Sequence, residues 1–285
     1  MTPALPAVEH DPLHVRAAVT AARSAGRRVG FVPTMGALHR GHASLVERAK
    51  AECDEVVVSI FVNPKQFGPG EDFARYPRRL DEDIALLAGA GATLVFVPDT
   101  LAAYPPGHAT SVVVGNPSAP FEGAIRPGHF SGVATVVCWL FNVVTADVAY
   151  FGAKDWQQTV VVRRMVADLA MPISISVCPT VREADGLAMS SRNAYLSADD
   201  RARAPALHEG LRAAERLWLR GEGVAACEEA IRAALAARDV ACDYAAVVDP
   251  ESLSAPREGA GAVALVAGRL GTTRLIDNLP LPPRS

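Results

Sequence analysis

The chain has 285 residues, half of them apolar, and a formal net charge of −3. This length accommodates one large domain or two ordinary ones with a sizeable core. The bulk charge and the lack of long basic or acidic runs argue against nucleic acid or a membrane surface as a partner, but they leave room for a local anion site.

Cysteine usage and hydropathy predict a cytoplasmic protein. The five cysteines are an odd number and include no Cys-x-x-Cys pair, which is typical of reduced thiols. Residues 1–6 lack a basic segment followed by an apolar one, so no secretory signal is expected. The longest apolar stretch, residues 132–144, is too short to span a bilayer and predicts a buried helix.

Short β-branched runs alternate with stretches of helical periodicity over the first two thirds of the chain. Continuous apolar runs are typical of strands covered on both faces, and the alternation favours an α/β domain with a parallel sheet and right-handed crossovers. The predicted strands are residues 28–32, 55–62, 93–97, 147–151 and 173–177. The predicted helices between them are residues 43–53, 80–90 and 157–169.

The pattern changes after about residue 185, which predicts a second, smaller α+β domain. Ser197, followed by two acids, is typical of a helix N-cap. The predicted helices are residues 201–220 and 224–238, and the predicted strands are residues 244–248, 262–266 and 273–276. We therefore expect domains at residues 1–182 and 183–285.

Residues 33–42, Pro-Thr-Met-Gly-Ala-Leu-His-Arg-Gly-His, follow the first of these predicted strands and lead into a helix. Free N–H groups at a helix start bind anions, and Gly36 and Gly41 permit close approach of the backbone to a ligand. His39 and His42 lie three residues apart, so both rings can donate to phosphate oxygens. A metal site, or simple capping of the helix, is the alternative for this pair. The stretch is neither a Walker loop nor Gly-x-Gly-x-x-Gly.

Residues 61–67, Phe-Val-Asn-Pro-Lys-Gln-Phe, lie at the carboxyl end of the next predicted strand, where α/β sheets place ligands. Asn63 and Gln66 offer amides that bind hydroxyl and carboxylate groups without adding charge. An ordinary polar turn is the alternative.

Residues 150–158, Tyr-Phe-Gly-Ala-Lys-Asp-Trp-Gln-Gln, also end a strand and begin a helix. Lys154 offers a positive charge to phosphates, and Asp155 can hold a ribose hydroxyl. A surface Lys-Asp pair at a helix start is the alternative.

Residues 189–192, Met-Ser-Ser-Arg, combine two hydroxyls, backbone donors and a guanidinium, which suit a polyphosphate. They lie near the expected domain boundary, where a segment can close on a nucleotide. A solvated loop is the alternative.

The His-x-Gly-His stretch resembles the signature of the nucleotidylyltransferase superfamily, and all four stretches in this order resemble the pantoate–β-alanine ligase family. Residues 72–78, 126–137 and 269–278 match the family too, so the resemblance covers about residues 28–278. It implies a Rossmann-like N-terminal domain, a smaller C-terminal domain that closes over the ATP site, and a homodimer. It also implies that ATP, Mg²⁺, (R)-pantoate and β-alanine are used, through a pantoyl adenylate.

The resemblance assigns roles to residues of all four stretches. His42 is the family's proton donor, and His39, Lys154 and Arg192 are further catalytic candidates that neutralise phosphate charge. Gln66 and Gln158 are expected to hold pantoate, and Gln66 also β-alanine. The ATP site is expected to comprise Met35, Gly36, Ala37, Leu38, His39, Arg40, Gly41, His42, Gly152, Ala153, Lys154, Asp155, Val181, Met189, Ser190, Ser191 and Arg192.

For Mg²⁺, Glu82 and Asp83 are weak candidates, because this ion keeps waters and is expected to be carried mainly by ATP. The chain departs from the family pattern at three positions. Lys65 replaces an apolar residue, Ala153 an acid and Trp156 a tyrosine. Two alternatives stay open: transfer of a nucleotidyl group to a phosphate, and nucleotide sensing without turnover.

Overall fold

The computed structural model describes residues 5–284. Residues 1–4 and residue 285 lie outside the described part. The expectation that residues 1–6 carry no secretory signal falls partly on these residues. By its internal contacts the chain divides into two units. The first holds the chain up to Gly152 together with Val161–Cys178, and the second holds Ala153–Val160 and the chain from Pro179 onward.

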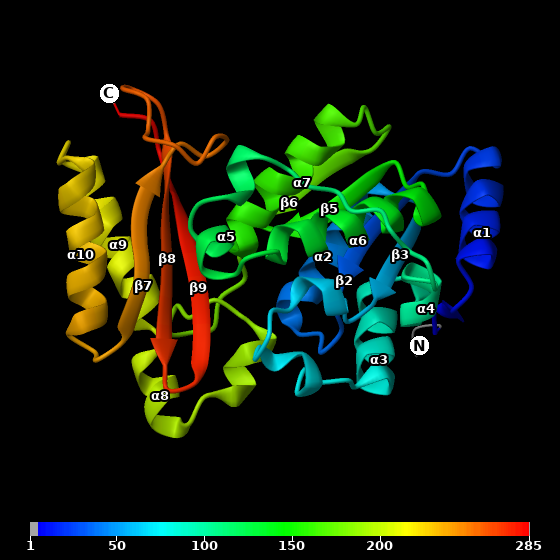
Figure 1. Ribbon diagram of the computed structural model, residues 1–285, viewed down its shortest axis with the longest axis horizontal. Helices are drawn as coiled ribbons and strands as arrows, with labels where there is room; N and C mark the ends of the chain where they lie inside the picture. Colours follow the sequence, from blue (N-terminus) through cyan, green and yellow to red (C-terminus); the bar gives the residue numbers. More distant parts are fainter. Residues whose placement is uncertain (1–4, 285) are drawn as a thin grey trace. The chain divides into compact units, whose positions relative to one another are not determined.

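The first unit is built on a six-stranded sheet in the order β1-β4-β3-β2-β5-β6, of which Figure 1 labels β2, β3, β5 and β6. Its strands are β1 (Ala7–Glu9), β2 (Val29–Thr34), β3 (Glu55–Ile60), β4 (Leu94–Phe96), β5 (Val148–Gly152) and β6 (Ser174–Cys178). All pairs are parallel, which confirms the predicted sheet. The direction of winding reverses between β2 and β5. In open α/β sheets, ligands bind beyond the carboxyl ends of the strands at such a point.

The helices that accompany this sheet follow the predicted alternation. They are α1 (Pro12–Ser24), α2 (Arg40–Glu52), α3 (Leu80–Ala90), α4 (Thr100–Ala103), α5 (Glu122–Ile125), α6 (His129–Val144) and α7 (Trp156–Asp168). The bounds of α3 coincide with the predicted ones. The short β1 and the amphipathic α1 are additions that the sequence pattern did not predict.

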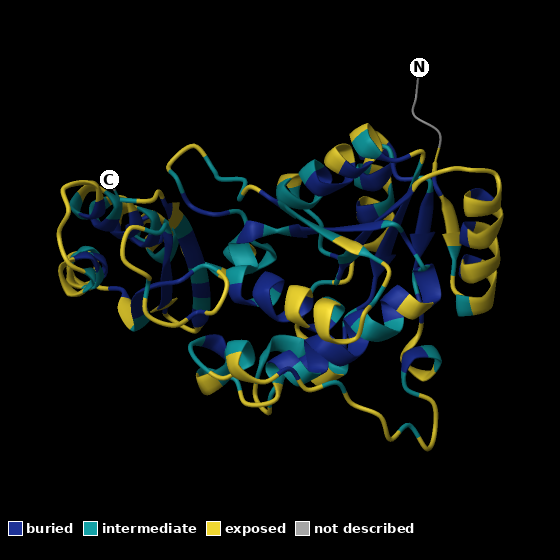
Figure 2. Cartoon of the chain, turned by 90° about the horizontal axis from the view of Figure 1, so that it is seen from above, coloured by how far each residue is buried: buried dark blue, intermediate teal, exposed yellow. Residues whose placement is uncertain are grey.

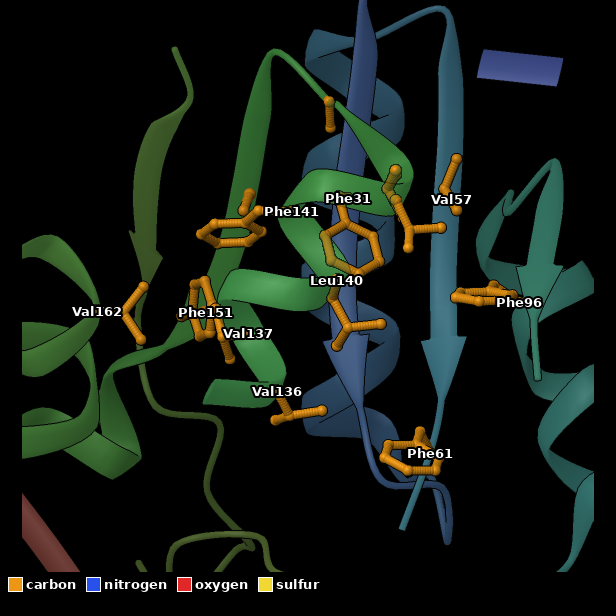
Figure 3. Packing of buried hydrophobic residues seen from close by; sticks show 14 of the residues in the cluster. Phe31, Val57, Phe61, Phe96, Val136, Val137, Leu140, Phe141, Phe151 and Val162 are labelled. Atoms are coloured by element: carbon orange, nitrogen blue, oxygen red, sulfur yellow. The ribbon is translucent and has the colours of Figure 1, made fainter. Parts of the chain in front are cut away.

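Helix α6 is the buried helix expected around residues 132–144, and it packs on one face of the sheet. Figure 3 shows Leu140 and Phe141 of α6 beside Phe31 of β2. The rings of Phe31 and Phe141 meet edge to face with centroids 6.3 Å apart. Such burial, at about 25 cal/mol per Å² of apolar surface, anchors α6 and therefore fixes the position of its N-terminus. Among residues 5–284, no helix has the length and apolar character needed to cross a membrane.

The second unit packs helices on an antiparallel sheet in the order β7-β8-β9, which confirms the predicted α+β class. Its elements are β7 (Ala241–Val248), β8 (Ala262–Leu270), β9 (Thr273–Leu281), α8 (Ala198–Arg203), α9 (Ala206–Leu219) and α10 (Val224–Ala236). Figure 2 shows the buried residues in dark blue running along the strands of both sheets.

One predicted helix is wrong in its extent. The sequence pattern predicts a single helix over residues 201–220, but the structure divides this stretch between α8 and α9. Pro205 lies at the break, and a proline inside a helix removes a backbone donor and clashes with the preceding turn. Ser197 caps α8 as predicted, by accepting a hydrogen bond from the Asp200 N–H.

Candidate functional site

The loop between β2 and α2 is held by the buried carboxylate of Asp83, at the start of α3. Asp83 Oδ2 accepts from the Ala37 N–H at 3.0 Å, and Oδ1 accepts from the Leu38 N–H at 2.7 Å. Gly36 has φ +82°, and a Cβ there would lie 3.0 Å from Asp83 Oδ2 and from Ile60 Cγ2. Burial raises the pKa of the Asp83 carboxyl. The Asp83 side chain therefore fixes the backbone path of the loop. Gly36 permits this path because it has no Cβ that would contact Asp83.

His39 and His42 form a capping box at the start of α2. His39 Nδ1 accepts from the Gly41 N–H at 3.1 Å, and His42 Nδ1 accepts from the His39 N–H at 3.3 Å. The ring centroids lie 4.2 Å apart. A neutral imidazole that accepts at Nδ1 carries its proton on Nε2. The capping interpretation and the donor interpretation are therefore compatible, because capping fixes the tautomer that donates from Nε2.

Arg40 lies on the exposed face of α2 between the two histidines. Its guanidinium pairs with Glu47 at 2.8 Å, with both side chains about half exposed. An exposed pair of this kind contributes little to stability. The positive charge of Arg40 is therefore directed to the protein surface.

Gln66 ends a short 3₁₀ turn, η1 (Pro64–Gln66), after β3, and its amide is oriented by its neighbours. Asn63 Nδ2 donates to Gln66 Oε1 at 3.1 Å, so Gln66 Nε2 is directed the other way, where it lies 3.0 Å from Met35 Sδ. Tyr104 in turn donates to Asn63 Oδ1 at 2.7 Å. Burial raises the pKa of Tyr104 to about 12, so its hydroxyl stays a donor at neutral pH. The chain Tyr104–Asn63–Gln66 thus presents amide donors beside the β2 loop.

The backbone of η1 is held by the start of α6. His129 Nδ1 lies 2.9 Å from the Gln66 carbonyl, and its Nε2 lies 3.2 Å from Arg126 Nη1. Because a carbonyl only accepts, Nδ1 carries the proton and Nε2 accepts from Arg126. Burial and the Arg126 charge lower the pKa of His129 to about 4. Gly132 completes the contact, because a Cβ there would lie 2.2 Å from the Lys65 carbonyl oxygen.

Lys65, the departure from the family pattern beside Gln66, is exposed and directed elsewhere. Its ammonium lies 3.0 Å from His108 Nδ1 and 4.3 Å from the centre of the Tyr104 ring. A cation over an aromatic face is stabilised by the ring quadrupole. The substitution therefore leaves the Asn63–Gln66 hydrogen bond in place.

In the second unit, Val181 and Met189–Arg192 belong to one hairpin-like segment. The Met189 N–H donates to the Val181 carbonyl at 3.0 Å, and Arg182 pairs with Ala188 in an isolated antiparallel bridge. Ser190 then caps the 3₁₀ turn η5 (Ser191–Tyr195) by accepting from the Arg192 N–H at 3.3 Å. Two segments that the sequence analysis assigned to one ATP site are thus adjacent within this unit.

Lys154 lies in the 3₁₀ turn η4 (Ala153–Asp155) of the same unit, just before α7. Its ammonium is 3.7 Å from Asp155 Oδ1, and its side chain is 19% exposed, against 48% for Asp155. Gln158 lies partly buried in the first turn of α7. Of the departures, Ala153 is buried, and the Trp156 indole donates to the Pro250 carbonyl at 3.0 Å.

The weak metal candidates have different surroundings. Glu82 is 71% exposed and pairs with Arg79, whereas both oxygens of Asp83 accept from the β2 loop. Within residues 5–284, no group of three or more His, Cys, Asp or Glu side chains is arranged to hold a metal ion. Asp83 is thus a loop-holding residue.

The sequence patterns did not indicate the residues whose hydrogen bonds hold the predicted site residues in place. These are Asp83 as a loop acceptor, Tyr104, and the pair of Arg126 and His129. Arg126 and His129 lie in a segment that matches the family, but their target is a backbone carbonyl about sixty residues away in the sequence, which no local pattern reveals.

Similarity to known proteins extends over nearly the whole chain. The family model described as pantoate-beta-alanine ligase matches residues 7–280. The chain belongs to the pantoate–β-alanine ligase family. This confirms the family resemblance found in the four stretches.

Individual members of the family agree over nearly the whole chain. A pantothenate synthetase of Chloroflexus aurantiacus is 53% identical over 270 residues, which are 93% of this chain and 96% of that protein. The crystal structure of pantothenate synthetase from Thermus thermophilus superposes with a TM-score of 0.91 at 51% identity, covering 97% of this chain and 100% of that one. The Francisella tularensis pantoate-beta-alanine ligase, complexed with beta-gamma ATP and beta-alanine, has a TM-score of 0.81 at 32% identity, covering 96% and 97%.

The role of Asp83 predicts a contrast between neighbouring acids. Asp83→Asn keeps the size of the side chain but replaces one acceptor by a donor, so it should lower the free energy of unfolding by about 1–3 kcal/mol. Amide hydrogen exchange at Ala37 and Leu38 should become faster. The matched change Glu82→Gln, at an exposed carboxylate, should alter the free energy by less than about 0.5 kcal/mol. Equal effects of the two changes would show that Asp83 does not hold the loop.

The lowered pKa of His129 predicts a pH dependence of stability. Between pH 7 and 5 the unfolded chain protonates this ring, whose ordinary pKa is 6.5, while the folded protein, with a pKa of about 4, does not. The unfolded state then binds more protons, so the free energy of unfolding should fall by about 1–2 kcal/mol as the pH drops. Urea unfolding of His129→Gln should lose this part of the pH dependence, and the exposed His14→Gln should keep it. An unchanged pH dependence in His129→Gln is the contrary result.

Proposed function

We propose that this chain condenses (R)-pantoate with β-alanine, using ATP and giving (R)-pantothenate, AMP and diphosphate through a pantoyl adenylate. The observation that carries the proposal is family membership over residues 7–280, together with the presence of His39, His42, Lys154 and Arg192. A family member, the Francisella tularensis ligase, is complexed with beta-gamma ATP and beta-alanine. The proposal places this chain in the biosynthesis of pantothenate.

The first step joins two anions, so charge has to be neutralised where they meet. A carboxylate oxygen of pantoate attacks the α-phosphorus of ATP, the bond to the β-phosphate oxygen breaks, and diphosphate leaves. The Nε2–H groups of His39 and His42 are suited to donate to phosphate oxygens, since their Nδ1 atoms accept from the backbone. Lys154 and Arg192 supply positive charge to the same polyphosphate.

Neutral residues hold the carboxylate in line with the phosphorus. Gln66 Nε2 is directed away from Asn63 and is free of formal charge, so it suits a pantoate hydroxyl or carboxylate without competing with the cations. Gln158 is proposed as its counterpart. Well-oriented reactants can gain roughly 7–11 kcal/mol over reactants that meet in solution, so positioning by these amides is a second source of rate beside charge neutralisation.

The second step is aminolysis of the activated acyl group. The neutral amine of β-alanine attacks the acyl carbon, the bond to the phosphate oxygen breaks, AMP leaves, and the new amide nitrogen loses a proton. Gln66 is proposed to bind β-alanine as well. The adenylate is already activated, so no protein nucleophile is assigned.

The ATP site is proposed to comprise the residues that the family resemblance assigns to it. These are Met35, Gly36, Ala37, Leu38, His39, Arg40, Gly41, His42, Gly152, Ala153, Lys154, Asp155, Val181, Met189, Ser190, Ser191 and Arg192. The loop N–H groups and Gly residues supply close backbone contacts, and Lys154 and Arg192 supply positive charge.

Mg²⁺ is proposed to arrive with ATP, held mainly by phosphate oxygens, where it would supply charge neutralisation. This agrees with the two hydrogen bonds that occupy Asp83 and with the preference of Mg²⁺ for few protein ligands. We further propose a homodimer in the cytoplasm. The free state of all five cysteines supports a reducing compartment.

One incubation separates this proposal from its alternatives. With ATP and pantoate but no β-alanine, mass spectrometry should detect a pantoyl adenylate, and sustained AMP release should require β-alanine. A nucleotide sensor would form neither product. An enzyme that transfers nucleotidyl groups to phosphates would leave pantoate unmodified.

Two substitutions test the assigned roles. Lys154→Ala should slow adenylate formation at least about a hundredfold, the scale of a lost transition-state donor, as measured by single-turnover diphosphate release. Gln66→Ala should impair the use of pantoate more than the binding of ATP. The exposed neighbour provides a control, since Lys65→Ala should change either parameter by about twofold at most. Near-normal diphosphate release in Lys154→Ala, or loss of ATP affinity alone in Gln66→Ala, would refute the corresponding role.

A further inference from the structure

Asn278, on β9, hydrogen-bonds the backbone of the turn that carries Lys154. Its Nδ2 donates to the Ala153 carbonyl at 2.8 Å and to the Lys154 carbonyl at 2.7 Å. The side chain is 3% exposed, and its Oδ1 has no hydrogen-bond partner among residues 5–284. Among the described residues, the Asn278 amide therefore acts as a hydrogen-bond donor, through its two N–H groups.

The neighbouring residue, Asp277, links the same strand to the other nucleotide segment of the second unit. Its carboxylate pairs with both terminal nitrogens of Arg182, at 2.6 and 3.0 Å, and Asp277 is 3% exposed. Arg182 also donates to the Asn278 carbonyl at 3.1 Å, and it follows Val181 directly. Two consecutive residues of β9 thus contact both segments that are proposed to bind ATP in this unit.

The turn needs such a contact because it is too short to define its own geometry. η4 has three residues, and the hydrogen bonds of a 3₁₀ turn are poorly aligned. When two successive carbonyls are held by one planar amide, the peptide planes on both sides of Lys154 are held, and with them the direction of its Cα–Cβ bond. Of the short side chains, only asparagine offers two N–H donors from one nitrogen at this length.

We propose that Asn278 is a positioning residue for Lys154, which it holds in the orientation that phosphate neutralisation requires. This inference rests on the proposed function. A displacement of about 1 Å in a reacting group can lower a rate about a hundredfold, so loss of the amide has a kinetic effect well beyond its effect on stability. Asp277 and Arg182 hold β9 against the neighbouring segment and so fix the strand from which Asn278 acts.

The test is a double-mutant cycle between Asn278 and Lys154, measured as single-turnover diphosphate release from ATP and pantoate. Asn278→Ala alone should slow release about a hundredfold. In a Lys154→Ala background the same change should slow it by about twofold at most, because the group that Asn278 positions is gone. Asn278→Asp keeps the shape of the side chain but loses both N–H donors, so it should slow release as Asn278→Ala does. Because it leaves no cavity, it shows that the slowing comes from the lost hydrogen bonds.

A control separates positioning from general stability. Leu281→Ala, also on β9 and 3% exposed, should lower the melting temperature but leave the release rate at 25 °C within about twofold of the unchanged enzyme. Equal slowing by Asn278→Ala with and without Lys154 overturns the inference alone. Absence of adenylate in the unchanged enzyme overturns the proposed function and this inference with it. If Asn278→Ala fails to fold by circular dichroism, Asn278→Ser, which retains one donor, takes its place in the cycle.

Discussion

The site residues of the first unit depend on one interaction. It is the pair of hydrogen bonds that the Asp83 carboxylate accepts from the loop between β2 and α2. A loop that leaves a strand and presents its backbone to a polyanion has N–H groups that neither the sheet nor the next helix satisfies. The Asp83 carboxylate accepts hydrogen bonds from two of these N–H groups, and these bonds fix the loop in the absence of a ligand. The same solution recurs at η1, where His129 holds the Gln66 carbonyl, and at η4, where Asn278 holds two carbonyls.

This arrangement separates residues that face a substrate from residues that hold them. His39 and His42 are constrained at Nδ1 by backbone N–H groups, so each ring has its donor on Nε2. Gln66 is likewise constrained at Oε1 by Asn63. Preorganised donors need little rearrangement as charge develops in a transition state, and this is the main source of electrostatic catalysis. The chemistry we propose therefore depends on these neutral donors as well as on Lys154 and Arg192.

Much of the fold could be predicted from the sequence because its signals are local. The parallel strands are continuous apolar runs, and α3 is predicted to the residue because its periodicity and acidic start are both clear. β1 and the break at Pro205 were missed, since a three-residue strand carries little pattern and one proline lies among strong helix formers. The residues of the site were named through resemblance. Asp83, Tyr104 and Asn278 were not assigned their roles, because each acts on atoms more than forty positions away.

The central claim is that pantoate is activated by attack of its own carboxylate on the α-phosphorus of ATP. The direct measurement uses pantoate labelled with ¹⁸O in its carboxylate, with ATP and β-alanine, followed by mass spectrometry of the products. The account predicts that one labelled oxygen passes to each AMP, because the bond between the acyl carbon and that oxygen breaks in the second step. Unlabelled AMP, with the oxygen lost from the pantoate carboxylate found in orthophosphate or in water instead, would contradict it.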